Sequence, residues 1–113
     1  MALENTHYGY RRIGEMLESC RSIFFIGIGG ISMSALAQLS ATLGYVVGGS
    51  DRSENEQTAT LRAQGIPVYE GHSAANISRY DAVIYTVAIG ADNPEYIAAR
   101  EAGKPLFSRS DYL

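Results

Sequence analysis

The chain of 113 residues has little of what would assign it to several common classes of protein. Its single cysteine, Cys20, excludes an intramolecular disulfide, which suits the reducing cytoplasm where we expect the protein to act. A net charge of −3 with no basic block gives no footprint for nucleic acid. No hydrophobic run approaches the length of a membrane span, and the polar start MALEN does not resemble a signal peptide. We expect one globular domain that contacts neither nucleic acid nor membrane.

Lysine is also nearly absent, and the one lysine, Lys104, does not belong to an ATP-binding P-loop. Such a loop needs the pattern GxxxxGK[ST], in which the lysine contacts the β- and γ-phosphates and the hydroxyl holds magnesium. Here Pro105 follows Lys104, and Ala98 stands where the first glycine should be. The sequence contains no HExxH, CxxC or GxSxG motif either. We therefore predict no catalytic residue and no metal site in these residues.

Glycine, in contrast, is concentrated where it has chemical meaning. Residues 22–34, SIFFIGIGGISMS, place an apolar run before three glycines and a segment of helical period after them. Strand, tight turn and helix in this order form a unit that binds nucleotide phosphates. Gly27 allows the sharp turn, Gly29 lacks the Cβ that would keep a pyrophosphate from the backbone, and the first helical turn offers unpaired N–H groups. The spacing fits GxGxxG with Ser32 as the third member; a turn that only packs a helix on a sheet is the alternative.

The rest of the chain alternates between strands and helices. A capping box over residues 53–56 predicts the start of a helix that ends at Gly65, and residues 8–20 predict a short amphipathic helix before the first strand. The alternation predicts an α/β fold, a Rossmann-like, doubly wound, parallel five-stranded sheet in three layers. We expect strands at 23–26, 45–49, 67–70, 82–86 and 106–107, and helices at 30–43, 53–65 and 93–103.

Candidate binding residues fall after successive strands, where ligands bind in such a sheet. Asp51 ends the second apolar run, 24 residues after Gly27, where an acidic side chain can bind a ribose hydroxyl. It could instead only neighbour a helix cap. Arg52 could be a solvated surface charge or a ligand contact, and a lone loop histidine such as His72 is usually only exposed. Thr86, Ala88 and Ile89 could contact a substrate or simply end a buried strand; for Arg109 a surface role is favoured over an anion contact.

Several short motifs carry a resemblance to a known family. The loop FIGIGGISMS at residues 25–34 closely resembles the amino-terminal loop of the Mur ligases. Further similar motifs follow in the family's order over residues 22–113: LGY at 43–45, GSD at 49–51, GH at 71–72, TVAI at 86–89, DNPE at 92–95 and AAREAG at 98–103.

In the Mur ligases the first domain holds the UDP end of the substrate, a central domain binds ATP, and a third brings the amino acid. The resemblance implies that residues 1–21 are a tail and helical extension, and 22–113 the UDP-binding domain, with the ATPase and carboxy-terminal domains absent. His72 gains support, because the Gly-His pair contacts uridine in the family. The expected site is Gly27, Gly29, Gly30, Ile31, Ser32, Met33, Ser34, Asp51, His72, Thr86, Ala88 and Ile89.

Within the family, the residues are most similar to the branch that joins L-alanine to UDP-N-acetylmuramic acid, using ATP and Mg²⁺ in the full-length enzyme. The resemblance thus implies a cytoplasmic ligase fragment, inactive by itself and without a cofactor of its own. Three alternatives remain open: the relative that attaches recycled murein tripeptide to the same sugar nucleotide, the NAD-binding domain of an oxidoreductase, and a regulatory module that only senses a nucleotide.

Overall fold

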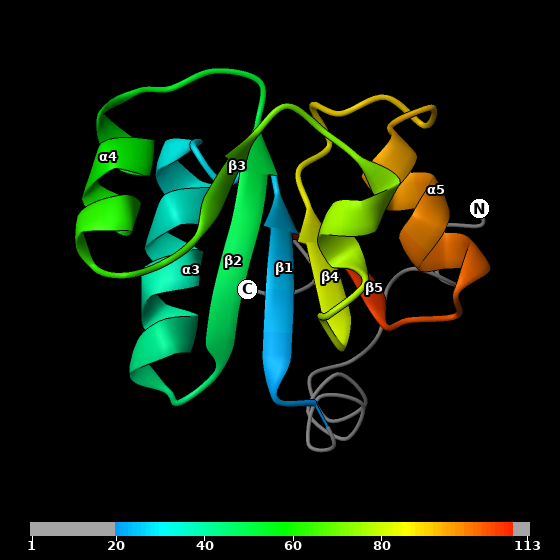
Figure 1. The fold of residues 1–113 in the computed structure, drawn as a ribbon, viewed down its shortest axis with the longest axis horizontal. Coiled ribbons are helices and arrows are strands. Elements are labelled where there is room, and N and C mark those ends of the chain that lie inside the picture. The colour runs from blue at the N-terminus through cyan, green and yellow to red at the C-terminus, as the bar shows by residue number, and fades with distance from the viewer. Residues whose placement is uncertain (1–19, 110–113) are drawn as a thin grey trace.

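The apolar run before the glycines forms strand β1 (Ser22–Ile26), the middle strand of a five-stranded sheet in the computed structural model (Figure 1). The structure describes residues 20–109. The sheet order is β3-β2-β1-β4-β5, and every neighbouring pair is parallel. The remaining elements are α3 (Ile31–Thr42), β2 (Val46–Asp51), α4 (Glu56–Ala63), β3 (Val68–Glu70), the 3₁₀ helix η1 (Ala74–Ile77), β4 (Ala82–Tyr85), α5 (Pro94–Glu101) and β5 (Leu106–Ser108).

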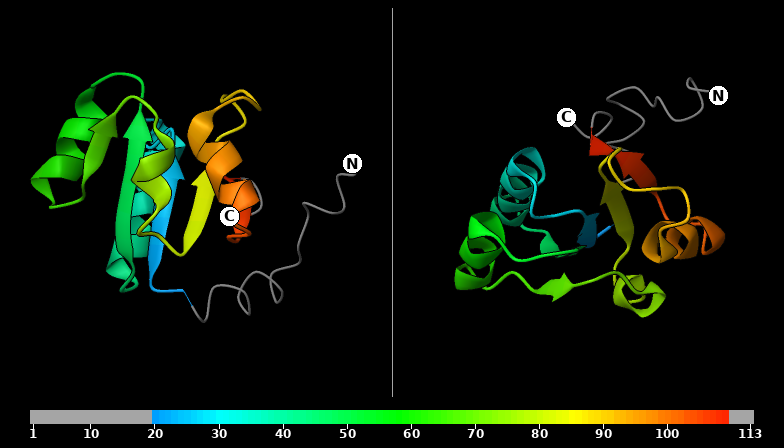
Figure 2. Two further views of the ribbon diagram at one scale, coloured as in Figure 1. Left: turned by 45° about the vertical axis from the view of Figure 1, so that its right-hand side comes forward. Right: turned by 90° about the horizontal axis from the view of Figure 1, so that it is seen from above.

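Helices cover both faces of this sheet, so the molecule has three layers. Helices α3 and α4 lie on one face, and η1 and α5 lie on the other (Figure 2). Every residue of β1 is buried, as expected for a parallel strand covered on both sides. Its side chains alternate between two cores: Ile23 and Phe25 pack with α3 and α4, whereas Phe24 and Ile26 pack with η1 and α5. The predicted Rossmann-like α/β fold is confirmed.

Most helix ends follow the sequence signals. Gly44, beyond the end of α3, has a φ of 104°, which glycine adopts without steric cost. Asn93 caps α5 by accepting hydrogen bonds from two backbone N–H groups, with Pro94 at the first helical position. The predicted capping box at residues 53–56 is wrong in register. The cap of α4 is Asn55, paired reciprocally with Thr58, because Thr58 offers both the backbone donor and a hydroxyl acceptor.

Two other differences concern the strands and their connections. Strand β2 extends to Asp51, two residues beyond the predicted end, so this side chain belongs to the strand itself. Helix η1 was not predicted. The predicted helix at 8–20 lies outside the described residues except for Cys20. None of the helices between residues 20 and 109 has the length and apolar character needed to span a bilayer.

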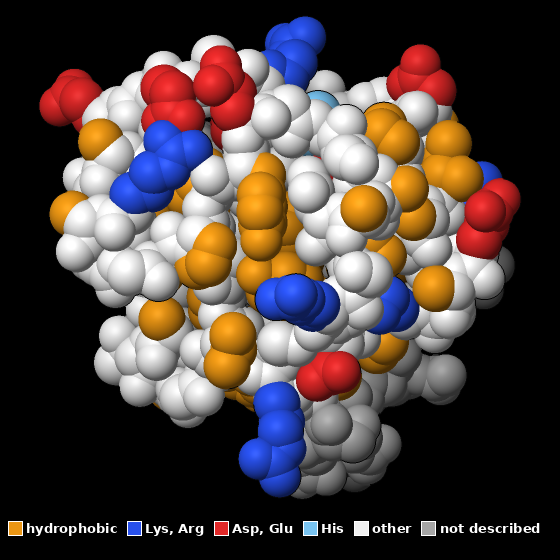
Figure 3. All heavy atoms as spheres, viewed as in Figure 1, with side chains coloured by type: hydrophobic (Ala, Val, Ile, Leu, Met, Phe, Trp, Pro, Cys, Tyr) orange, Lys and Arg blue, Asp and Glu red, His pale blue; other side chains and the backbone are white. Residues whose placement is uncertain are grey.

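On the face shown in Figure 3, hydrophobic side chains gather along the middle, acidic side chains lie mostly toward the upper edge, and basic side chains are scattered over the face. Aromatic packing lies on the same side of the sheet as η1 and α5: the buried ring of Phe24 contacts the rings of Tyr69 and Tyr80, of which Tyr69 is exposed. No large area of one charge sign dominates this face, which agrees with the small net charge of the chain. Charge steering over long distances is therefore weak, and a ligand must be selected by local groups.

Candidate functional site

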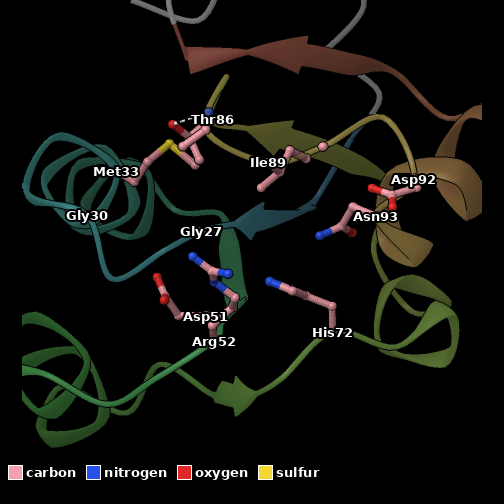
Figure 4. Close-up of a pocket in the computed structure, with 12 residues that line it drawn as sticks. Gly27, Gly30, Met33, Asp51, Arg52, His72, Thr86, Ile89, Asp92 and Asn93 are labelled. Carbon is pink, nitrogen blue, oxygen red and sulfur yellow. Dashed lines mark hydrogen bonds between the residues drawn. The ribbon is translucent and has the colours of Figure 1, made fainter.

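A pocket of about 360 Å³ lies beyond the carboxyl ends of β1, β2 and β4 (Figure 4). This is the edge at which open parallel sheets bind their ligands. The predicted residues that line it are Gly27, Gly30, Met33, Asp51, His72, Thr86, Ala88 and Ile89. The other lining residues are Arg52, Gly90, Asp92 and Asn93. Gly29, Ile31, Ser32 and Ser34 belong to the same loop and helix start but do not line the pocket.

The glycine loop is connected to β2 by backbone hydrogen bonds. Gly27 has a φ of 86°, and its N–H and that of Ile28 donate to the carbonyl of Ser50 at 2.8 and 2.9 Å. A Cβ at Gly27 would lie 2.7 Å from Cγ2 of Thr86, so both conformation and space require glycine. The predicted tight turn at Gly27 is confirmed.

The other two glycines differ in what their missing side chains permit. The N–H of Gly29 donates to Oδ2 of Asp51 at 2.8 Å, and a Cβ there would lie 2.7 Å from that oxygen. Glycine at 29 therefore makes room for Asp51, rather than for a pyrophosphate as the sequence suggested. Gly30 is exposed and lines the pocket, and a Cβ there would meet nothing closer than 3.7 Å. Gly30 is thus the position that keeps the pocket open beside the backbone.

Positive groups collect at the start of α3. The N–H groups of Ile31, Ser32 and Met33 form its first turn, and such groups have no acceptor within the helix. The hydroxyl of Ser34 donates to the carbonyl of Ile31 at 3.0 Å, so it belongs to the helix rather than to the pocket. The side chain of Arg52 extends into the pocket beside the loop (Figure 4). Free amides and a guanidinium together suit an anion.

Asp51 forms hydrogen bonds to two segments beside the pocket, the glycine loop and the loop after β2. Its Oδ2 accepts from Gly29, and its Oδ1 accepts from the N–H of Ser53 at 3.5 Å. Asn55 continues this connection by donating from Nδ2 to the carbonyl of Gly29 at 3.1 Å. Asp51 is not the cap of α4, because Asn55 has that role. The carboxylate is half-buried and keeps lone pairs for a further donor.

The loop after β4 forms the opposite wall. Thr86 and Ile89 point toward the pocket from this loop (Figure 4), and the N–H of Ala88 donates to Oγ1 of Thr86 at 3.5 Å. Arg109 comes after β5 and does not line the pocket. Within residues 20–109, no group of three or more His, Cys, Asp and Glu side chains is arranged to hold a metal ion.

A buried carboxyl group behind the pocket was missed by the sequence reasoning. Glu95 is fully buried and its two oxygens have four hydrogen-bond partners, while His72 lines the pocket in front of it. Oε1 of Glu95 contacts Oγ of Ser50 at 2.5 Å and Nδ1 of His72 at 2.9 Å. Its Oε2 accepts from the N–H of Ser73 at 3.2 Å and from Nδ2 of Asn76 at 2.7 Å. The DNPE motif at residues 92–95 contains Glu95. An acidic residue is expected in the first turn of a helix, so the motif gave no separate reason to place Glu95 near a site.

The strand order and the crevice at the carboxyl edge define the class: a Rossmann-like α/β domain with its pocket where that fold binds ligands. The comparison with known proteins narrows this class. A family model described as "Mur ligase family, catalytic domain" matches residues 22–113, and the chain belongs to the Mur ligase family.

Individual relatives agree with that assignment. A UDP-N-acetylmuramate–L-alanine ligase from Clostridium novyi (strain NT) is 46% identical over 93 residues, 82% of this chain and 20% of the relative. The crystal structure of UDP-N-acetylmuramate-alanine ligase from Thermotoga maritima is similar at 46% identity with a TM-score of 0.78, over 80% of this chain and 21% of that one.

A second solved structure belongs to another branch. The UDP-N-acetylmuramate:L-alanyl-gamma-D-glutamyl-meso-diaminopimelate ligase from Neisseria meningitides matches at 30% identity with a TM-score of 0.76, over 84% of this chain and 30% of that one. The chain spans about a fifth of the length of the curated L-alanine ligases that it matches.

Proposed function

We propose that this chain is the domain that holds the UDP part of UDP-N-acetylmuramic acid in a UDP-N-acetylmuramate–L-alanine ligase of peptidoglycan synthesis. The observation that carries the proposal is the pocket, where the glycine loop, Asp51 and His72 meet at the carboxyl edge of the sheet. The higher identity to ligases named for L-alanine, 46% against 30% for the tripeptide ligase, favours the first branch.

Each part of UDP has a matching group in the pocket or directly beside it. The diphosphate binds at the first turn of α3, where the N–H groups of residues 31–33 and the Arg52 guanidinium supply donors. A ribose hydroxyl donates to Asp51, whose carboxylate keeps unused lone pairs. His72 contacts the nucleoside, and Thr86, Ala88 and Ile89 form the wall opposite Arg52.

The role of this domain in the reaction is positioning rather than chemistry. Fixing the nucleotide at one end of a long substrate brings its far end, the lactyl carboxylate, to the ATP and Mg²⁺ of another domain. There the carboxylate is phosphorylated and the amine of L-alanine displaces phosphate. Because residues 1–113 contain no P-loop, the chain by itself neither hydrolyses ATP nor forms an amide. Phosphate release by the pure chain, abolished by a change in the pocket, would contradict this statement.

A titration with UDP and NAD separates the proposal from the dehydrogenase alternative. A good site for a ligand the size of UDP gives a Kd of a few micromolar, and a domain without its neighbours is weaker, about ten micromolar to one millimolar. UDP or UDP-N-acetylmuramic acid should shift the NMR amide signals of residues 27–34 and those near Asp51 and His72. NAD should shift them less at the same concentration. Tighter binding of NAD than of UDP would reject the proposal.

A further inference from the structure

Glu95 occupies a position that the proposed UDP site does not explain. It lies in the first turn of α5, has no exposed surface, and is separated from the pocket by His72. A buried carboxyl group costs free energy unless its oxygens are fully paired. Here each oxygen has two partners, drawn from β2, the loop after β3, and η1.

The partners determine which form the carboxyl group takes. The N–H of Ser73 and the amide Nδ2 of Asn76 can only donate, so Oε2 must accept. Beside Oε1 lie a hydroxyl and a ring nitrogen, each of which can donate. Two fixed donors on Oε2 and two possible donors on Oε1 suit the ionised carboxylate, which accepts about four hydrogen bonds and donates none. The amino end of α5 adds a dipole that favours the negative charge.

The ionised carboxylate in turn determines where His72 carries its proton. Oε1 of Glu95 lies 2.9 Å from Nδ1 of His72, and a lone pair on Nδ1 would face a lone pair on the oxygen. Nδ1 therefore carries hydrogen and donates. The hydroxyl of Ser50, 2.5 Å from Oε1 and 2.9 Å from Nδ1, donates to the same carboxylate. In the neutral imidazole a proton on Nδ1 leaves Nε2 as an acceptor.

We propose that Glu95 is a positioning residue that holds His72 as the Nδ1–H tautomer, so that Nε2 faces the pocket as an acceptor for a hydroxyl or N–H of the bound nucleoside. The ring of His72 points into the pocket between Arg52 and Asn93 (Figure 4), and its side chain keeps 15% exposure. The nucleoside part of this inference rests on the proposed function, whereas the tautomer does not.

Hydrogen-bond donors and acceptors of the pocket suit different parts of the ligand. The Arg52 guanidinium and the backbone N–H groups that begin α3 are hydrogen-bond donors only. Donors of this kind suit phosphate oxygens, which accept hydrogen bonds. A nucleoside presents donors as well, and a pocket without acceptors would leave them unpaired at a cost of affinity. Asp51, beside the glycine loop, and Nε2 of His72 supply such acceptors.

The substitution Glu95→Gln tests the inference with almost no change in shape. Its amide NH₂ cannot face the N–H of Ser73 without two donors meeting, so it should turn toward His72 and Ser50. Their groups can adapt, since the hydroxyl can accept and the imidazole can move its proton. We expect the Nε2–H tautomer in this variant, and an acceptor in the pocket becomes a donor. UDP affinity should fall about tenfold, while affinity for inorganic pyrophosphate changes less than about twofold.

Long-range ¹H–¹⁵N spectra of the 113-residue chain at about pH 8.5, where imidazole is ordinarily neutral, show directly which ring nitrogen is protonated. Two variants serve as controls. Glu101→Gln removes a charge from the exposed end of the same helix, and Ser50→Ala removes one donor but keeps the carboxylate. Both should retain the Nδ1–H tautomer. Since the wild-type spectrum alone tests the tautomer, the inference stays testable even if a variant does not fold.

The outcomes are distinct. The Nδ1–H tautomer in the wild type, with a switch in Glu95→Gln and weaker UDP binding, supports the inference. The Nε2–H tautomer or a doubly protonated ring in the wild type overturns it. A tautomer switch with unchanged UDP affinity overturns the contact with the nucleoside. Absence of UDP binding by a wild-type chain with the Nδ1–H tautomer overturns the proposed function and the nucleoside contact, and leaves the role of Glu95 toward His72 supported.

Discussion

The two ends of the parallel sheet use polar side chains in different ways. At the amino end, the N–H of Arg21 donates to Oδ2 of Asp81 at 2.8 Å, and Nζ of Lys104 donates to the carbonyl of Tyr80 at 2.6 Å. These contacts join loops at or near the surface. At the carboxyl end, Glu95 and Ser50 are fully buried and support His72, which faces a pocket.

Two serines on neighbouring strands make the contrast sharper. The hydroxyl of Ser22, at the start of β1, donates to the carbonyl of Arg79 at 3.4 Å and accepts from the N–H of Asp81 at 2.9 Å. Its partners, including the Asp81 carboxylate, belong to the loop before β4, and none of them lines the pocket. The hydroxyl of Ser50, in β2, contacts two ionisable side chains. At the amino end of the sheet, the polar groups form hydrogen bonds with one another. At the carboxyl end, Glu95 and Ser50 hold His72 so that one of its ring atoms remains available to a ligand.

The largest effect on stability should come from removing the buried carboxylate. Glu95→Ala leaves the donors of Ser50, His72, Ser73 and Asn76 without their acceptor, and each buried donor left unpaired is costly. We expect a loss of about 3 kcal/mol or more in the free energy of unfolding, measured with denaturant. Glu101→Ala, at the exposed end of α5, should cost less than about 0.5 kcal/mol. Equal losses of stability in the two variants would show that the buried carboxylate contributes no more than the exposed one.

Glycines at the two ends give the next comparison. Gly27 and Gly44 both have positive φ, 86° and 104°, but only Gly27 faces a neighbouring side chain where a Cβ would be. Gly44→Ala should lose about 1 kcal/mol from backbone strain. Gly27→Ala should lose about 2 kcal/mol, because Cγ2 of Thr86 must also move away. Thermal unfolding of both variants measures the difference, and a smaller loss at Gly27 would show that Thr86 yields freely.

The sequence was sufficient to predict the five strands and the helices α3, α4 and α5, though not η1, because its local signals agree. Apolar runs alternate with helical segments, and Gly44 and the Asn93-Pro94 pair mark helix ends that the structure has. It also located the loop, Asp51 and His72 at one edge, since parallel strands end together. The position of the α4 cap was wrong because Ser53 with Glu56 and Asn55 with Thr58 both fit a capping box, and only the second pair forms the reciprocal hydrogen bonds.

The network behind His72 was beyond sequence reasoning for a different physical reason. Ser50, Asn76 and Glu95 come from β2, η1 and α5, and they meet only through tertiary packing. Local structure also accounts for the presence of each residue in the sequence: Ser50 lies in a strand, Asn76 in a turn, and Glu95 is an acidic residue at the start of a helix. The role of Gly29 was hidden similarly, because its close contact with Asp51 spans 22 positions in the chain.

A moderate effect, on binding rather than on folding, should follow from Gly30→Val. Gly30 has a φ of −68° and open space at its Cβ, so the chain should fold with a loss of about 1 kcal/mol from a poorer helix cap. The side chain should enter the pocket and weaken UDP binding at least tenfold, about 1.4 kcal/mol, measured by calorimetry.

Gly29→Val is the instructive comparison for that experiment. A side chain there collides with Asp51 and Thr58, so this variant should lose folding stability along with binding. The two neighbouring glycines should thus separate the effect on the ligand from the effect on the fold. Unchanged UDP affinity in a folded Gly30→Val variant would remove the loop from the proposed site.

The smallest effect should come from Asp81 at the amino end, and it depends on pH. Hydrogen bonds to the carboxylate, first from the N–H of Arg21 and then from the backbone and hydroxyl of Ser22, hold the pKa of Asp81 below its ordinary value despite slight burial. A carboxyl whose pKa is lower in the folded state contributes stability above its unfolded pKa and loses it as pH falls through the folded pKa. The wild type should exceed Asp81→Asn by less than about 0.5 kcal/mol at neutral pH, because solvent screens an exposed carboxylate. Below about pH 4 the difference should shrink and then vanish. Denaturant unfolding of both proteins at several pH values measures it, and a difference that grows toward acid would contradict the assigned sign.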